Sequence, residues 1–330
     1  MPKKEKGKLR VIPLGGLNEI GKNLTVLEYA DDIIIVDCGM GFPDEDMPGI
    51  DIVIPDISYL EDNRDKIRGI VLTHGHEDHI GAIPYVLRQI NPPIYATKLT
   101  LGIIKNKLEE HSLPCEPSLN CVKAGQTIRL GSFAVEFIHV NHSIPGAVAL
   151  AIRCPAGLVV QTGDFKIDTT PIHDNVIDLA RFGQLGNEGV LALLSDSTNA
   201  ERPGFTSTER LVGESFSNFF QKAGDHRIIV ATFSSNIHRI QQIVDSAVKY
   251  NRKVSVCGRS MINVIQTAIE LGYINVPDNT FIDIDMIKNY TKNGFSISEV
   301  EAYFYDMCHV NYILPALIES GELKVDEAAA

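Results

Sequence analysis

The segment Thr73-His74-Gly75-His76-Glu77-Asp78-His79 joins an apolar run to a stretch with helical spacing. It places three histidines and an aspartate in one tight turn at the end of a predicted buried strand, a usual position for a functional site. Histidines of an ordinary surface loop are the alternative, but so dense a cluster rarely arises by chance. Imidazoles with a carboxylate suit zinc or manganese. The spacing predicts that His74 and His76 face one ion. Asp78 and His79 are then free to face a second.

Two later strand ends supply further candidate ligands. His142 follows one β-type run, and Asp164 follows another. An aspartate can bridge two ions through its two oxygens and help them to acidify a water molecule. The sequence therefore predicts a two-metal site and metal-assisted hydrolysis.

The first 165 residues alternate short β-branched runs with turn signals, which predicts a strand-rich fold. Strands are expected at residues 11–14, 24–27, 33–36, 69–72, 133–138 and 158–161. Helices are expected at residues 80–90 and 99–111.

From about residue 190 the pattern changes to alternating strands and helices, which is typical of a parallel α/β unit. Strands are expected at residues 190–194, 227–233 and 253–256, and helices at residues 209–222, 237–250 and 261–271. A capping-box pattern at residues 296–299 predicts a helix to about residue 309, and a second helix is expected at residues 314–320. Two such helices are too common to indicate DNA binding.

Composition sets outer limits on the class of protein. The formal net charge of −12 argues against a surface that attracts nucleic acid everywhere, but it leaves room for a local basic groove. No apolar run approaches the roughly 18 to 20 residues of a membrane helix, and the basic residues 1–8 lack the apolar segment of a signal peptide. Six cysteines without a Cys-x-x-Cys pair predict neither a disulfide framework nor a thiolate zinc site. We expect a cytoplasmic protein with no membrane partner.

The ligand pattern described above, together with Asp37 at the end of an early strand, resembles the metallo-beta-lactamase superfamily. The resemblance implies an α/β fold, the αββα sandwich. It also implies a particular role for Asp37, which would orient a metal ligand from behind.

Three further segments resemble bacterial ribonuclease J, of the beta-CASP branch. They are residues 13–23 (PLGGLNEIGKN), 194–199 (LSDSTN) and 234–239 (SSNIHR). This resemblance extends over about residues 8–290. It implies a metal-dependent ribonuclease with endonuclease and 5′-to-3′ exonuclease capability, acting in RNA processing and decay with two zinc ions or with manganese.

The same resemblance implies roles for particular residues. Asp196 matches the first beta-CASP motif and joins Asp78, His79 and Asp164 as an expected catalytic residue. The expected substrate-binding residues are Phe233, Ser234, Ser235 and Asn236. Gly49 and Asp51 match a structural calcium position. The ordinary alternatives are that Asp196 merely caps a turn and that residues 234–236 merely begin a helix.

The expected domains are a basic N-terminal tail (1–8), a metallo-beta-lactamase domain (9–208), a partial beta-CASP domain (209–290) and a divergent helical tail (291–330). The C-terminal motifs of the family are not found, so the sandwich is expected to lack its C-terminal part. Two other functions therefore stay open. One is a catalytically impaired RNA-binding fragment or a partner of a full-length ribonuclease J, and the expected partners are RNA and either a second copy or a ribonuclease J. The other is a metallo-hydrolase of small esters or thioesters.

Overall fold

The computed structural model describes residues 7–44, 46–172, 174–224, 228–286 and 302–306. The chain divides into two compact units, an N-terminal unit of residues 1–208 and a C-terminal unit of residues 209–330. None of the helices within the described ranges is both long and apolar enough to cross a membrane.

The first sheet of the N-terminal unit has the strand order β1-β2-β3-β4-β5-β6. Strands β1 to β3 run antiparallel, and β3 to β6 run parallel. The strands are β1 (Leu9–Gly15), β2 (Leu24–Tyr29), β3 (Asp32–Val36), β4 (Ile67–Val71), β5 (Ile94–Ala96) and β6 (Leu119–Cys121). Because β3 and β4 are parallel neighbours, the loops that follow them lie at the same edge of the sheet.

The second sheet has the order β11-β10-β9-β8-β7. Its strands are β7 (Thr127–Leu130), β8 (Phe133–His139), β9 (Val148–Cys154), β10 (Gly157–Gln161) and β11 (Ala192–Leu194). Both β8 and β10 are antiparallel to β9, which lies between them, so their carboxyl ends share one edge. β11 pairs in parallel with β10, so this strand belongs to the second sheet, and the α/β alternation expected from residue 190 begins only after it.

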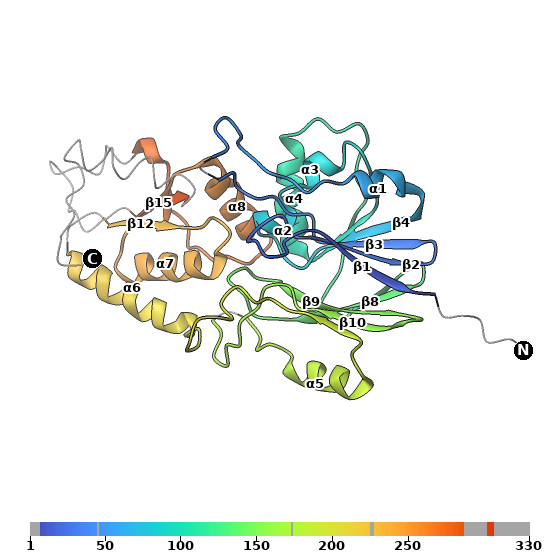
Figure 1. The fold of residues 1–330 in the computed structure, drawn as a ribbon. Coiled ribbons are helices and arrows are strands. Elements are labelled where there is room, and N and C mark those ends of the chain that lie inside the picture. Colours follow the sequence, from blue (N-terminus) through green and yellow to red (C-terminus); the bar gives the residue numbers. More distant parts are fainter. Residues whose placement is uncertain (1–6, 45, 173, 225–227, 287–301, 307–330) are drawn as a thin grey trace, which may run out of the picture. The chain divides into compact units, whose positions relative to one another are not determined.

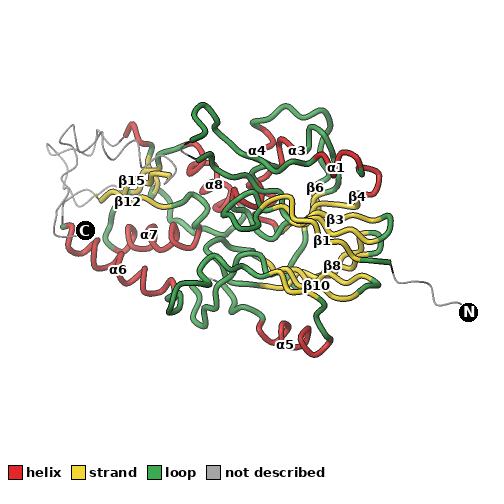
Figure 2. Tube along the Cα trace, viewed as in Figure 1, coloured by secondary structure: helices red, strands yellow, loops and turns green. Residues whose placement is uncertain are grey.

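The two sheets face each other across a buried core. Leu27, Ile34 and Val71 from the first sheet contact Phe137 and Leu150 from the second in one apolar cluster. The helices of this unit are α1 (Ser58–Asp62), η1 (Arg64–Lys66), α2 (Glu77–Ile80), α3 (Ile83–Val86), α4 (Lys98–Glu109) and α5 (Leu179–Glu188). Figures 1 and 2 show α1, α3 and α4 on the outer side of the first sheet and α5 on the outer side of the second. The predicted αββα sandwich is confirmed.

The single helix predicted for residues 80–90 is wrong, because α2 already ends at Ile80 and only the short helix α3, Ile83–Val86, lies within this stretch. Pro84 lies at the start of α3 and has no N–H to donate to the carbonyl of Ile80, so a continuous helix would lose a hydrogen bond there. Gly81, between the helices, leaves room for Met40: a Cβ at Gly81 would lie 2.4 Å from Met40 Cγ.

Asp178 caps the N-terminus of α5, where its side chain accepts a hydrogen bond from the Arg181 amide at 2.9 Å. We expect Asp178→Ala to lower the free energy of unfolding by about 1 kcal/mol, because the amide loses its partner. Urea denaturation measures the change. The control Asp62→Ala, at an exposed aspartate of α1, should leave the midpoint nearly unchanged. Equal midpoints for the two variants would contradict the capping role.

The C-terminal unit is built on a parallel sheet of strand order β12-β15-β13-β14. The strands are β12 (Ile228–Thr232), β13 (Val254–Val256), β14 (Phe281–Ile282) and β15 (Ala302–Asp306), and the helices are α6 (Glu209–Ala223), α7 (Ile237–Lys249) and α8 (Arg259–Glu270). Helix α7 buries an apolar stripe that includes Ile240, Ile243 and Val244. This spacing of three and four residues is that of a helix packed on one face.

The helix predicted to run to about residue 309 is wrong where it can be compared, because residues 302–306 form β15. This strand lies between β12 and β13 and hydrogen-bonds to both. Its sequence, AYFYD, contains three aromatic residues that favour strands, and pairing on two sides outweighs the local capping signal. The remainder of the predicted tail helices lies outside the described residues.

Candidate metal centre

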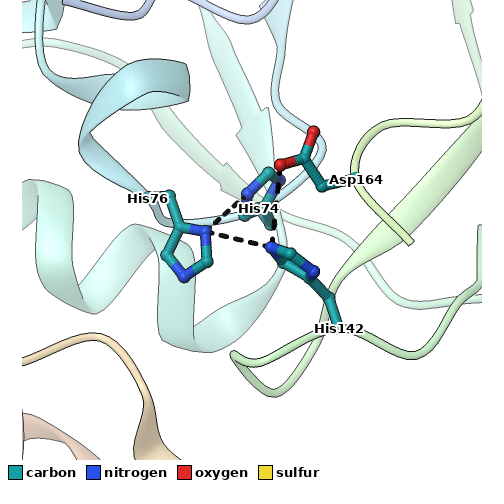
Figure 3. Close-up of side chains that lie close together, drawn as sticks. All are labelled: His74, His76, His142 and Asp164. Atoms are coloured by element: carbon teal, nitrogen blue, oxygen red, sulfur yellow. Dashed lines mark hydrogen bonds and ion pairs between the residues drawn. The ribbon is translucent and has the colours of Figure 1, made fainter. Parts of the chain in front are cut away.

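Four side chains from three loops converge at one edge of the N-terminal unit (Figure 3). His74 and His76 come from the loop after β4, His142 from the loop after β8, and Asp164 from the loop after β10. His76 Nδ1 lies 3.0 Å from His74 Nε2 and 3.1 Å from His142 Nε2. An Asp164 carboxylate oxygen lies 3.8 Å from His142 Nε2. We call these four residues the first ligand group.

A second ligand group consists of Asp78, His79 and the same Asp164. His79 Nε2 lies 3.4 Å from Asp78 Oδ2 and 3.3 Å from Asp164 Oδ1. The two oxygens of Asp164 therefore face different groups, Oδ1 the second and Oδ2 the first.

The donor atoms of both groups fit a divalent metal ion. Atoms that bind one tetrahedral zinc lie about 3.3 Å apart, because each is about 2.0 to 2.1 Å from the ion. Within each group, the candidate donor atoms lie within 4.8 Å of one another. Nitrogen and carboxylate donors at such spacings suit zinc, manganese and related ions. The site is therefore one for a divalent metal.

Asp37 holds His79 from behind. Its Oδ2 lies 2.8 Å from His79 Nδ1, and its carboxylate also accepts hydrogen bonds from the amide and hydroxyl of Thr73. The Thr73 hydroxyl in turn lies 3.0 Å from His74 Nδ1. With Nδ1 occupied in both rings, the Nε2 atoms are left to face an ion. Asp37 has a φ of 61°, a left-handed conformation that costs energy and that its hydrogen bonds stabilise.

Burial and neighbouring charge set protonation in the centre. Burial and the adjacent imidazoles lower the pKa of His74 well below its ordinary value, and the same causes lower that of His76 to about 3. Burial also lowers the pKa of His142. Burial alone would raise the pKa of Asp164, but its hydrogen bond to His79 and nearby imidazoles outweigh this and lower it to about 2. At neutral pH these side chains are in the states that metal binding requires.

Asp78 and His79 each affect the protonation of the other. Burial opposes ionisation of Asp78, yet contact with His79 lowers the Asp78 pKa. Burial also opposes charge on His79, but Asp37 and the two carboxylates of its group raise the His79 pKa well above its ordinary value. His79 must therefore release a proton when it binds an ion.

We expect Asp37→Asn to weaken metal binding by about 10-fold to 100-fold, because an amide is a poorer partner for His79 Nδ1 than a carboxylate. Competition with a fluorescent zinc chelator measures the affinity. The matched control is Asp56→Asn, at an aspartate whose carboxylate contacts only Ser58 among the hydrogen bonds given for it. An unchanged zinc affinity in Asp37→Asn would contradict the orienting role.

The motif did not indicate all of the residues in contact with the ligands. The side-chain nitrogen of Asn23 lies 3.2 Å from His79 Nε2, and the Ser143 hydroxyl lies 3.3 Å from His76 Nε2. Gly39 approaches the ligand turn so closely that a Cβ there would lie 1.6 Å from the Asp78 carbonyl oxygen. Asn23 ends the segment 13–23 that resembles ribonuclease J, but no local signal in the sequence marks Asn23, Ser143 or Gly39 as a neighbour of the ligands.

Asp196 follows β11, and its negative charge acts to raise the pKa of His142. Its carboxylate accepts hydrogen bonds from the amide and hydroxyl of Thr198, so it does cap a turn, and its amide donates to the Thr162 hydroxyl. This capping leaves one carboxylate oxygen, Oδ2, without a hydrogen bond to Thr198. A catalytic role for Asp196 remains a prediction.

Residues 233–236 connect β12 to α7 in the C-terminal unit. Phe233 is 51% exposed, and the Ser234 hydroxyl lies 3.2 Å from that of Ser260. The Asn236 side chain accepts a hydrogen bond from the Arg239 amide and caps α7. Asn236 therefore begins a helix, as the ordinary alternative expected. RNA binding by this loop, including Ser235, remains a prediction.

Gly49 and Asp51 are exposed residues of the loop after β3. Gly49 has a φ of 83°, which favours glycine. Neither residue belongs to the two ligand groups found among the described residues. Calcium binding here also remains a prediction.

Comparison with known proteins places this centre in a family. The model of the metallo-beta-lactamase superfamily matches residues 17–192, which include every residue of both ligand groups. The chain belongs to the metallo-beta-lactamase superfamily. A second model, described as the beta-CASP domain of ribonuclease J, matches residues 225–298.

The similar curated proteins are ribonucleases J, which confirms the resemblance seen in the sequence. Ribonuclease J 1 of Streptococcus pyogenes is 51% identical over 280 residues, covering 84% of this chain and 50% of the relative. Ribonuclease J of Synechocystis is 48% identical over 283 residues, covering 85% of this chain and 44% of the relative. The chain thus spans about half the length of the curated relatives that it matches. A solved protein of unknown function from Enterococcus faecalis shares the fold, with 16% identity, a TM-score of 0.66, and coverage of 94% of this chain and 86% of that chain.

Proposed function

We propose that this chain binds two divalent ions, zinc or manganese, and hydrolyses phosphodiester bonds in RNA. The observation that carries the proposal is the position of Asp164, whose two oxygens face two separate groups of ligands. Three relatives, named ribonuclease J 1, ribonuclease J and ribonuclease J2 and 42–51% identical to this chain, support RNA as the substrate.

His74, His76 and His142 would hold the first ion, and Asp78 and His79 the second, with Asp164 shared. When bound, two such ions would supply an acidified water and charge stabilisation at the phosphoryl oxygens. The protein's own part is orientation. Thr73 and Asp37 fix the ring planes, and the burial of His74 and His79 keeps bulk water from the back of the centre.

The substrate would be bound mainly through its backbone and bases. Exposed Phe233 offers a ring for base stacking, while Ser234, Ser235 and Asn236 offer hydroxyl and amide groups suited to phosphate oxygens. Asp196 is proposed as a further catalytic residue because it matches the first beta-CASP motif. Gly49 and Asp51 are proposed to bind calcium. Pairing with a second copy or with a full-length ribonuclease J is also proposed.

The test uses one purified sample for two measurements. Metal content is measured by mass spectrometry, and cleavage is measured on a 5′-monophosphorylated RNA alongside a lactone and a thioester. Two ions per chain with RNA cleavage would support the proposal. Turnover of the lactone or thioester alone would select the small-substrate hydrolase. RNA binding without cleavage at saturating zinc or manganese would select the binding protein.

A further inference from the structure

The loop before β2 is hydrogen-bonded to the second ligand group through its backbone. The Asn23 amide donates to the Asp78 carbonyl at 3.0 Å, and the Asn23 carbonyl accepts from the Gly39 amide at 2.9 Å. The Cys38 amide donates to the His79 carbonyl at 2.8 Å. Three segments of the chain therefore meet at Asp78 and His79, and the Asn23 backbone is hydrogen-bonded to both of the others.

The side chain of Asn23 reaches the donor atoms themselves. Its Nδ2 lies 3.1 Å from the Asp78 carbonyl oxygen, 3.4 Å from Asp78 Oδ2 and 3.2 Å from His79 Nε2. The last two atoms are those that bring Asp78 and His79 together in the second ligand group. The contacts given for this side chain within the described residues involve neither His74, His76 nor His142.

Chemistry decides which end of the amide faces the ligands. The carbonyl oxygen of Asp78 can only accept a hydrogen bond, so it must face the nitrogen of the Asn23 amide and not the oxygen. An amide nitrogen does not bind a metal ion, because its lone pair is delocalised. Asn23 therefore acts as a hydrogen-bond donor to the carbonyl and carboxylate oxygens of Asp78. His79 Nε2 has one lone pair, which a bound ion would take, so its closeness to the Asn23 amide is a packing contact and not a lasting hydrogen bond.

A hydrogen-bond donor beside the second ligand group would limit the movement of the Asp78 carboxylate. The side chain of Asp78 is 32% exposed and stands on α2, a helix of only four residues. A carboxylate so placed can turn towards solvent, whereas a bond from Asn23 restrains it. Only three ligand side chains form this group among the described residues, so the geometry of each has a large share in the affinity.

We infer that Asn23 is a positioning residue for the second ion: its amide holds the Asp78 carboxylate beside His79, while the first ion is independent of it. The inference rests on the proposed two-metal centre.

Titration of the metal-free protein with Co²⁺, followed by visible absorption, tests this directly. In Asn23→Leu, which keeps the approximate shape and removes the donor, the dissociation constant of the second ion should rise by about 10-fold to 100-fold. The first should change by less than about twofold, and the absorption band of the second step alone should shift. The matched control is Asn187→Leu, at an exposed residue of α5. If leucine prevents folding, Asn23→Ser retains the backbone bonds and is titrated instead.

The outcomes separate the inference from the proposal beneath it. If the unsubstituted protein binds two ions and Asn23→Leu binds both equally well, the role of Asn23 is wrong and the metal centre stands. If both ions weaken equally in the variant, Asn23 supports the loop in general and does not position one ligand pair. If the unsubstituted protein binds no second ion, the two-metal centre is wrong and the inference falls with it.

Discussion

Replacing Asp164 by alanine should remove both metal ions, whereas replacing Asp78 by alanine should remove only one. Asp164 belongs to both ligand groups, with one oxygen 3.3 Å from His79 and the other 3.8 Å from His142. Asp78 belongs to the second group alone. Loss of both ions would lower RNA cleavage by about 10³-fold or more, equivalent to about 4 kcal/mol of transition-state stabilisation.

Mass spectrometry of the metal content and cleavage of a 5′-monophosphorylated RNA measure the two effects on the same samples. The control is Asp31→Ala, at an exposed aspartate in the turn between β2 and β3. Full metal content in Asp164→Ala would show that this carboxylate is not shared. Loss of both ions in Asp78→Ala would show that the second ion is needed to retain the first.

A single methyl group at Gly39 should unfold or distort the centre. A Cβ there would lie 1.6 Å from the carbonyl oxygen of Asp78, 2.2 Å from its carbonyl carbon and 2.8 Å from the His79 nitrogen. These are backbone atoms and cannot move aside as a flexible side chain does. We expect Gly39→Ala to lower the free energy of unfolding by about 3 kcal/mol or more, and the displaced turn to weaken the second ion.

Denaturant unfolding with and without zinc measures both effects. Gly183→Ala is the matched control because Gly183 lies in α5 and a Cβ there would meet nothing within 4 Å. In a helix this change should raise stability by about 0.5 to 1 kcal/mol. Similar destabilisation by the two variants would mean that the close approach of Gly39 to the Asp78 backbone does not cause the loss of stability.

The parts of the site that the sequence predicts well are those with local signals. His74 to His79 lie in one turn, and His142 and Asp164 follow β-type runs, so strand ends alone bring them to one edge. Asn23 and Gly39 had no such signal. Their closeness to Asp78 depends on how three loops meet in space, and neither residue type suggests a metal neighbour.

The errors in the fold have the same origin. The αββα sandwich followed from the resemblance and from strands with strong local patterns. Residues 80–90 have the apolar spacing of one helix, and this spacing gives no sign that Pro84 interrupts the helical hydrogen bonds. The capping signal at residues 296–299 describes one turn, whereas β15 is stabilised by pairing with β12 and β13, which lie far away in sequence.

The position of β15 in the sheet also affects how the C-terminal unit can fold during translation. The ribosome releases β12 and β13 well before residues 302–306, yet in the finished sheet β15 separates them. Until then, β12 and β13 each lack a neighbour that they have in the final order. The C-terminal unit therefore cannot fold strand by strand in the order of synthesis, and a nascent chain halted before residue 302 would have to leave this position open or fill it incorrectly.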